Sequence, residues 1–169
     1  MVRALILVLV MLGGCGWESR VKKLSDEEFK AYYALKPYMN DDTRKAYLKL
    51  KTEAERTKYL KSKGLHERFY KFEEHVRQAI VDGAVQTGWT KEMVYMSWGN
   101  PFDRRALAGR PASRSEMLVY RFEKQEDGSI LVWVPNSKTE YKAIARFIRE
   151  VYLDNDQVTE IIEKPGWGQ

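Results

Sequence analysis

The sequence predicts an α+β fold, in which an N-terminal helical layer and a short glycine-capped helix pack on one face of an antiparallel sheet of three to four strands. Apolar residues recur at helical spacing from residue 25 to residue 82. After residue 113 they alternate with polar residues, and turn dipeptides separate the runs. Between these two patterns lies the stretch GWTKEMVYMSWGNP, residues 88–101, which is predicted to be the short helix that joins them.

The composition is that of a folded domain with a basic helical half. Of the 169 residues, 44% are hydrophobic and 31% are charged, which excludes a disordered chain. Residues 20–80 contain 16 Lys and Arg against 10 Asp and Glu, whereas residues 88–169 contain 12 of each kind. The basic excess is either a solvated face or a surface attracted to an anionic membrane. A nucleic-acid partner is not expected, because no basic run is interleaved with aromatic residues.

Residues 1–14, MVRALILVLVMLGG, have the pattern of an export signal. Arg3 is followed by an apolar run that is shorter than the roughly 20 residues needed to cross a bilayer. Cys15, the only cysteine, comes directly after Leu12, Gly13 and Gly14. This arrangement resembles the bacterial lipoprotein signal. The resemblance implies cleavage before Cys15, a covalent diacylglycerol and an N-acyl chain such as palmitate on it, and a lipidated tether over residues 15–24. The alternative is an ordinary signal peptide or hydrophobic anchor with an incidental cysteine.

The residue after the cysteine bears on localisation. Gly16 stands where an aspartate would be the usual signal for retention in the inner membrane of enteric bacteria. The expected location is therefore the outer membrane, facing the periplasm, with the inner membrane and the cell surface left open. The single cysteine also excludes a disulfide within the chain.

The helical region, residues 25–82, has recognisable helix starts. Ser25 and Thr52 are each followed three residues later by glutamate, which is the capping-box pattern. A helix between them is predicted to begin at Asn40, Asp41 or Asp42. A fourth helix, continuous to residue 82, is predicted from the apolar face formed by Leu65, Phe69, Phe72, Val76, Ala79 and Ile80. His66 and His75 lack the partners of a metal site, so no metal is expected.

The sheet half begins with an alternating strand. Its alternation places Leu118, Tyr120 and Phe122 on one side, and Met117, Val119 and Arg121 on the other. Asp127-Gly128 predicts a hairpin to a strand over residues 130–134. Residues 138–147 fit a strand or a helix, and a strand is favoured from residue 147 onward. A polar turn at 154–156 then predicts a second hairpin, and residues 164–169 form a tail.

The joining stretch has its own start and stop signals. Thr90 is a predicted N-cap, Gly99 a predicted left-handed residue past the helix, and Pro101 prevents continuation. Trp98 and Tyr120 are expected in the core, where this helix packs on the sheet. Trp89 and Phe102 flank the helix and are expected to be exposed.

Residues 83–163 resemble the SmpA/OmlA lipoprotein domain, which has the BamE-like fold. The resemblance is carried by Gly88, Thr90, Glu92 and Val94, then Trp98-Gly99-Asn100-Pro101, Tyr120, Phe122 and the closing hairpin from Val151 to Thr159. It implies a non-catalytic binding module that acts on outer-membrane complexes, peptidoglycan or lipid. About 60 helical residues stand between tether and motif, which departs from the small family pattern. A weaker resemblance is to GWxTD-domain lipoproteins, on Gly88-Trp89, but the expected aspartate is absent.

No residue pattern points to catalysis. The chain has no GxSxG motif, no cysteine besides Cys15 and no carboxylate pair that spacing singles out, so no catalytic residues, metal or cofactor are expected. The predicted function is a scaffold or interaction module in envelope or outer-membrane protein assembly, with a protein partner of unknown identity. The alternatives are a lipid- or glycan-binding module and, less favoured, a cell-wall or lipid hydrolase. The predicted partner contacts are Trp89, Phe102, Arg104, Arg105 and Arg110, the arginines lying in a loop over residues 103–114.

Overall fold

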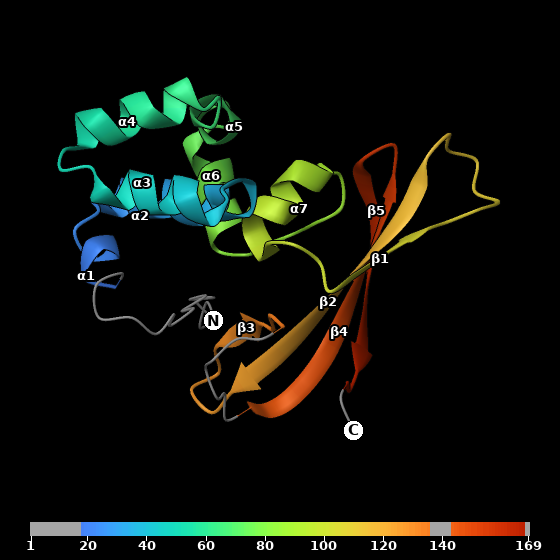
Figure 1. The fold of residues 1–169 in the computed structure, drawn as a ribbon. Helices are drawn as coiled ribbons and strands as arrows, with labels where there is room; N and C mark the ends of the chain where they lie inside the picture. The colour runs from blue at the N-terminus through green and yellow to red at the C-terminus, as the bar shows by residue number, and fades with distance from the viewer. Residues whose placement is uncertain (1–17, 136–142, 168–169) are drawn as a thin grey trace.

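The computed structural model of the chain describes residues 18–135 and 143–167. Within them it has seven α-helices and a five-stranded antiparallel sheet, so the predicted α+β class is confirmed. The helices gather on one side of the sheet, and α7 (Lys91–Trp98) lies nearest to it (Figure 1). The helical half contains α1 (Glu18–Val21), α2 (Asp26–Leu35), the 3-10 turn η1 (Lys36–Tyr38), α3 (Asp41–Lys49), α4 (Glu53–Ser62), α5 (His66–Tyr70) and α6 (Glu74–Val81).

The predicted helix starts are confirmed. At α2, the Ser25 hydroxyl accepts from the Glu28 amide at 3.4 Å, and the Glu28 carboxylate accepts from the Ser25 amide at 2.9 Å. Thr52 and Glu55 form the same reciprocal pair at α4. Of the three candidate caps for α3, Asn40 is the one used, because its side-chain oxygen accepts from the Thr43 amide at 2.8 Å.

The predicted continuous fourth helix is wrong, because the chain breaks between α5 and α6. Glu73 is extended, with φ −63° and ψ 156°, and Arg77 donates to the exposed end of α5 through the Phe72 carbonyl at 2.8 Å. Phe69 before the break and Ile80 after it are both fully buried. Core packing on both sides of the bend therefore overrides the regular spacing in the sequence.

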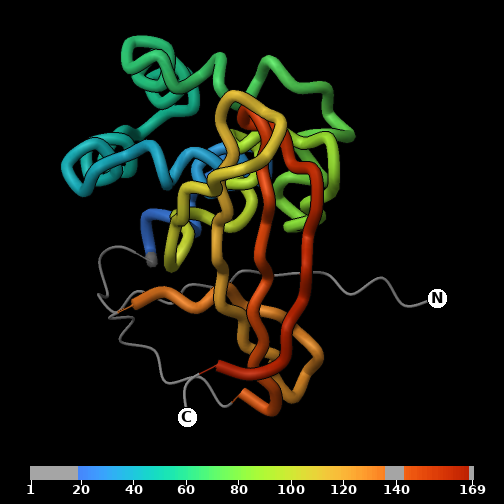
Figure 2. Tube along the Cα trace, turned by 90° about the vertical axis from the view of Figure 1, so that its right-hand side faces the viewer, coloured from blue at the N-terminus to red at the C-terminus, as the bar shows by residue number. Residues whose placement is uncertain are grey.

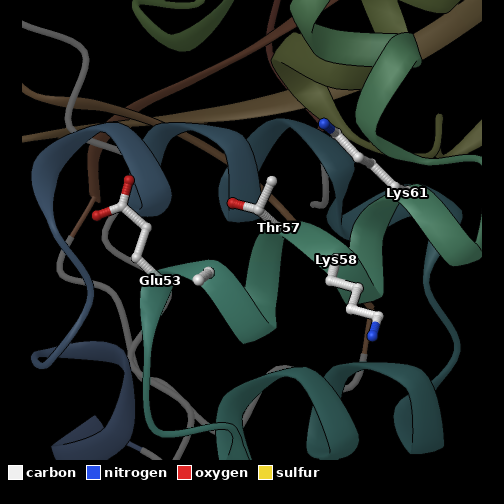
Figure 3. Close-up of a pocket in the computed structure, with 5 residues that line it drawn as sticks. Glu53, Thr57, Lys58 and Lys61 are labelled. Carbon is white, nitrogen blue, oxygen red and sulfur yellow. The ribbon is translucent and has the colours of Figure 1, made fainter.

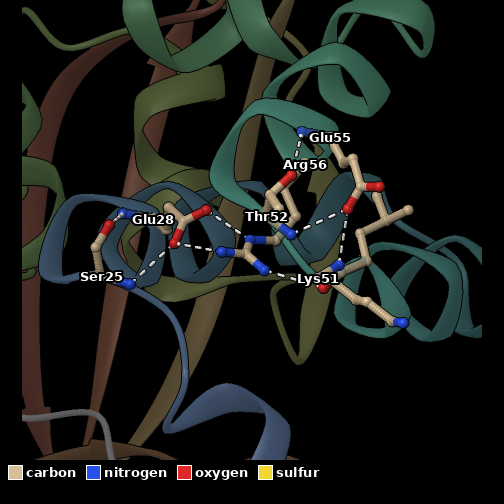
Figure 4. Close-up of polar contacts among 7 residues, drawn as sticks. Ser25, Glu28, Lys51, Thr52, Glu55 and Arg56 are labelled. Carbon is tan, nitrogen blue, oxygen red and sulfur yellow. Dashed lines mark hydrogen bonds and ion pairs between the residues drawn. The ribbon is translucent and has the colours of Figure 1, made fainter.

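A buried ion pair holds α4 against α2 (Figure 4). The Arg56 guanidinium donates from Nε to Glu28 Oε1 at 2.5 Å, from Nη2 to Oε2 at 3.0 Å, and from Nη1 to the Leu50 carbonyl at 3.0 Å. The two side chains are only 9% and 7% exposed. Burial alone would raise the pKa of Glu28, but the hydrogen bonds from Arg56 and the Ser25 amide outweigh burial and lower the pKa.

The sheet has the order β1-β2-β4-β5, and β3 also pairs with β2. Its strands are β1 (Asp103–Ala106), β2 (Ser115–Gln125), β3 (Ile130–Val132), β4 (Ala143–Asp154) and β5 (Gln157–Pro165). In Figure 2, β2, β4 and β5 run side by side as three long neighbours. β1 pairs with residues 116–119 and β3 with residues 122–124, so these two short strands lie end to end along one edge of β2.

The fifth strand, β1, corrects the prediction that residues 103–114 are a loop. Its sequence, DRRA, has no apolar alternation because it is an edge strand whose side chains are mostly exposed. Both predicted hairpins are confirmed, with positive φ at Gly128 and at Asn155 and Asp156. β4 begins at residue 143, which settles the helix-or-strand ambiguity for 143–147; residues 138–142 lie outside the described residues.

α7 touches both halves of the fold. Thr90 caps it, accepting from the Met93 amide at 3.4 Å. Gly99 follows it with positive φ, as predicted, but its φ 77° and ψ −158° lie in an extended region rather than the left-handed helical one. The Trp98 indole donates to the Gly83 carbonyl at 3.0 Å, and its ring packs on that of Tyr120 at 5.2 Å. The predicted core position of Trp98 and Tyr120 is confirmed.

Candidate functional site

Trp89 is not an exposed contact residue, and that prediction is wrong. Its side chain is 6% exposed and belongs to the core. The segment before α7 runs along β5: Gly88 donates to the Val158 carbonyl at 2.8 Å, and Val158 donates to the Trp89 carbonyl at 2.8 Å. This strand-like pairing turns the indole inward, which the sequence pattern around a short helix does not reveal.

The three predicted contact arginines do not form one patch. Arg104 pairs with Glu116, Arg105 with Asp103 at 2.7 Å, and Arg110 with Asp154 at 3.1 Å. Arg104 and Arg105 are neighbours on β1, so their side chains leave opposite faces of the sheet. Each arginine is thus paired with a carboxylate, which Arg104 shares with Lys91, and their expected role as a joint partner contact has no support in this geometry.

Phe102 is exposed as expected, at 41%, and it belongs to a cluster that the sequence did not reveal. The guanidinium carbon of Arg121 lies 3.5 Å from the centroid of the Phe102 ring, 5.3 Å from Trp133 and 5.1 Å from Trp167. Arg146 lies 5.2 Å from the Trp167 ring. We call these five residues the aromatic–arginine cluster.

The end-to-end arrangement of β1 and β3 builds this cluster. Phe102, just before β1, donates to the Val119 carbonyl, and Trp133, just after β3, donates to the Arg121 carbonyl, both at 2.8 Å. Their side chains therefore meet at the gap between the two short strands. Trp167 arrives from the end of β5, where its indole donates to the Phe122 carbonyl at 3.0 Å. Its place as tail or lid was open from sequence; here it covers the sheet.

The cluster lies on the sheet face turned away from α7. Arg121 shares a side of β2 with Met117 and Val119, as the alternation predicted, whereas Tyr120 and Phe122 pack against Trp98. Within the described residues Arg121 has no ion pair, and its buried Nε has no hydrogen-bond partner. The result is a cation held by aromatic faces, a surface suited to an apolar group accompanied by an anion.

One surface hollow lies along the exposed side of α4. It has a volume of about 570 Å³ and is walled by one helix, α4, with Glu53, Ala54, Thr57, Lys58 and Lys61 along it. Figure 3 shows these side chains on successive turns. A second pocket, of about 420 Å³, lies where α1 meets α3 and the loop to α4. It is lined by Arg20, Lys23, Leu48, Lys49, Leu50, Lys51 and Arg56.

Residues 18–135 and 143–167 contain neither a cluster of metal-ligating side chains nor a helix that could span a membrane. No group of three or more His, Cys, Asp or Glu side chains there is placed to hold a metal ion. His66 stacks on Tyr70 with ring centroids 4.4 Å apart, and the His75 side chain is 76% exposed. In the same ranges no helix has the length and apolar character needed to cross a membrane. The lipobox residues Leu12, Gly13 and Gly14, with Cys15, lie outside the described residues.

Comparison with known proteins gives no relative: no protein-family model, curated protein or solved structure matches the chain.

Proposed function

We propose that this protein is a lipid-anchored, non-catalytic lipoprotein of the bacterial outer membrane, facing the periplasm, that serves as an interaction module in envelope or outer-membrane protein assembly. Leu12-Gly13-Gly14-Cys15 is the observation behind the anchor. The aromatic–arginine cluster is the observation behind the interaction role. The BamE-like relationship of residues 83–163 is part of this proposal.

The composition of the cluster favours a protein partner. Trp and Arg are enriched among the residues that contribute most to protein–protein binding, and here both are partly exposed on the sheet face turned away from α7. Ile144, which has no partner at a register shift in β4 two residues before Arg146, is 59% exposed and adds an apolar side chain at this end of the sheet. The expected partner surface presents an apolar side chain next to a carboxylate, because Arg121 carries a positive charge with no ion pair in the described chain.

Acyl labelling tests the anchor. Cells fed a tagged palmitate analogue should label the wild-type chain, which should fractionate with the outer membrane. A Cys15→Ala chain should take up no label and leave that fraction. Retention of label and location by the Cys15→Ala chain would show that the lipoprotein assignment is wrong.

Photocrosslinking tests the cluster as a contact surface. A photoreactive residue at Phe102 is expected to give a discrete crosslinked product in living cells. The same residue at Lys58, an exposed position on α4, serves as the matched control and should give none. Adding Arg121→Gln should remove the product from position 102. Equal products at both positions, or a product indifferent to Arg121→Gln, would contradict the proposed surface.

A further inference from the structure

The charged residues that line the pocket at the start of the helical half are all cations. Arg20 and Lys23 come from α1 and the residues after it, and Lys49 and Lys51 from the end of α3 and the loop that follows. Arg56 of α4 completes the set, and no carboxylate is among the lining residues. Leu48 and Leu50 supply the apolar part of a cavity of about 420 Å³.

Four of these cations have no carboxylate within ion-pair distance in the described residues, although Glu55 attracts Lys51 from farther away. Arg20, Lys23, Lys49 and Lys51 form no ion pair within residues 18–135 and 143–167. Four other cations of the helical half are paired there: Arg44 with Asp41, Arg68 and Lys71 with Glu92, and Arg77 with Glu27. The pocket is therefore distinguished by the convergence of its cations on one cavity, since exposed lysines such as Lys58 and Lys61 are also unpaired in the described residues. Unpaired like charges that converge on one cavity repel each other, and a bound anion relieves that repulsion.

The geometry of the pocket specifies how an anion would be held. The Arg56 guanidinium is fixed by Glu28 and the Leu50 carbonyl, so it forms a rigid wall. The backbone amides of Lys51 and Thr52 already donate to Glu55, as Figure 4 shows. Contacts to an anion therefore come from the flexible lysine and arginine side chains, which suits a phosphate group whose oxygens accept from several donors at once.

We propose that this pocket binds the phosphate of an anionic lipid headgroup. A free phosphate ion and a lipid headgroup present the same phosphate group to the pocket. The position of the pocket favours the lipid headgroup. Glu18, where α1 begins, follows Cys15 by three residues, a length of chain that reaches at most about 11 Å. With the proposed anchor on Cys15, on which this choice of source rests, the pocket lies at the bilayer surface, where anionic headgroups are concentrated.

Lysine acetylation, read by mass spectrometry, tests the proposal on the mature chain purified from membranes. The chain is placed in neutral phosphatidylcholine vesicles, in vesicles that also contain phosphatidylglycerol, and in neutral vesicles with added inorganic phosphate. Lys23, Lys49 and Lys51 should react several-fold more slowly with phosphatidylglycerol present. Lys58 and Lys61, exposed on α4 outside the pocket, serve as internal controls and should keep their rates.

Two variants with the same change in net charge distinguish binding in the pocket from a general loss of positive charge. In a Lys49→Gln/Lys51→Gln chain, half-protection of Lys23 should require roughly 30-fold more anionic lipid, since each cation near such a surface contributes about a fivefold change. A Lys58→Gln/Lys61→Gln chain has the same charge change and should protect Lys23 as the wild type does. If acetylation slowed equally at all lysines, or at none of them, the proposal that this pocket binds the headgroup would be wrong.

Two further outcomes identify the source of the phosphate and show whether the anchor on Cys15 is present. Protection by inorganic phosphate without protection by phosphatidylglycerol would overturn the lipid assignment. The intact mass of the same sample reports whether Cys15 is acylated. A chain without acyl groups would refute the proposed anchor, and the phosphate titration, which needs no vesicle, would still show whether the pocket holds phosphate.

Discussion

Removing the Glu28 carboxylate should destabilise the protein far more than its capping role explains. In Glu28→Ala, Arg56 loses two of its three hydrogen bonds while its side chain remains 9% exposed, next to the Leu50 carbonyl alone. Breaking a buried pair on one side costs about 3–5 kcal/mol. Because Arg56 also borders an open pocket, we expect about 3 kcal/mol from the pair and about 1 kcal/mol from the lost cap.

The chain contains a matched control for this experiment. Glu55 occupies the same capping-box position on α4, but it is exposed and has no buried arginine partner. Glu55→Ala should therefore cost only about 1 kcal/mol. Urea unfolding followed by tryptophan fluorescence gives both values by linear extrapolation.

The difference in stability loss between the two variants measures the contribution of the buried Glu28–Arg56 pair. Equal losses for Glu28→Ala and Glu55→Ala would refute the inferred contribution of the buried pair. A Glu28→Leu/Arg56→Leu chain should recover much of the loss, because replacing both partners leaves no isolated charge in the interior.

Three further predictions concern the core and its pH dependence. The pKa values of Glu28 and Glu116 are lowered in the folded chain, because hydrogen bonds from basic partners outweigh burial. The stabilisation from these two carboxylates is therefore complete above their ordinary pKa of 4.5 and is lost as pH falls through their folded pKa values. The melting temperature should decrease as the pH is lowered below about 4.5, and a melting temperature that does not change with pH there would contradict this. Trp98→Phe removes the donor to the Gly83 carbonyl and should cost about 1–3 kcal/mol in urea unfolding; an unchanged midpoint would show that the bond contributes little. Gly99→Ala should cost about 1–3 kcal/mol through backbone strain alone, since no atom lies within 4 Å of the added methyl group, and a stability gain would contradict that reading.

Local signals in the sequence were sufficient for most of the elements. Capping boxes and hairpin dipeptides act between residues two to four positions apart, so Ser25, Thr52 and Gly128 could be assigned their roles without tertiary information. The break at Glu73 could not be foreseen, because no Gly or Pro marks it and it depends on burying residues on both sides of the bend.

The candidate site was largely hidden, since it depends on strand register. Phe102 and Trp133 meet at Arg121 only because β1 and β3 share one edge of β2. Alternation did place Arg121 on the correct face, but it could not say which aromatic residues would cover it. The prediction that Trp89 is exposed was wrong for the same reason, because its burial follows from pairing with β5, about 70 residues further along the chain.

If Cys15 carries the proposed lipid anchor, the double attachment of α7 has a mechanical consequence. On the helical side the Tyr38 hydroxyl donates to the Glu92 carbonyl at 3.3 Å, and the Ser97 hydroxyl donates to the Ile80 carbonyl at 2.6 Å. On the sheet side Lys91 donates to the Asp156 carbonyl at 2.8 Å. Tension between that anchor and a partner on the sheet would be carried jointly by α7 and by the segment before it, which pairs with β5 through Gly88 and Trp89.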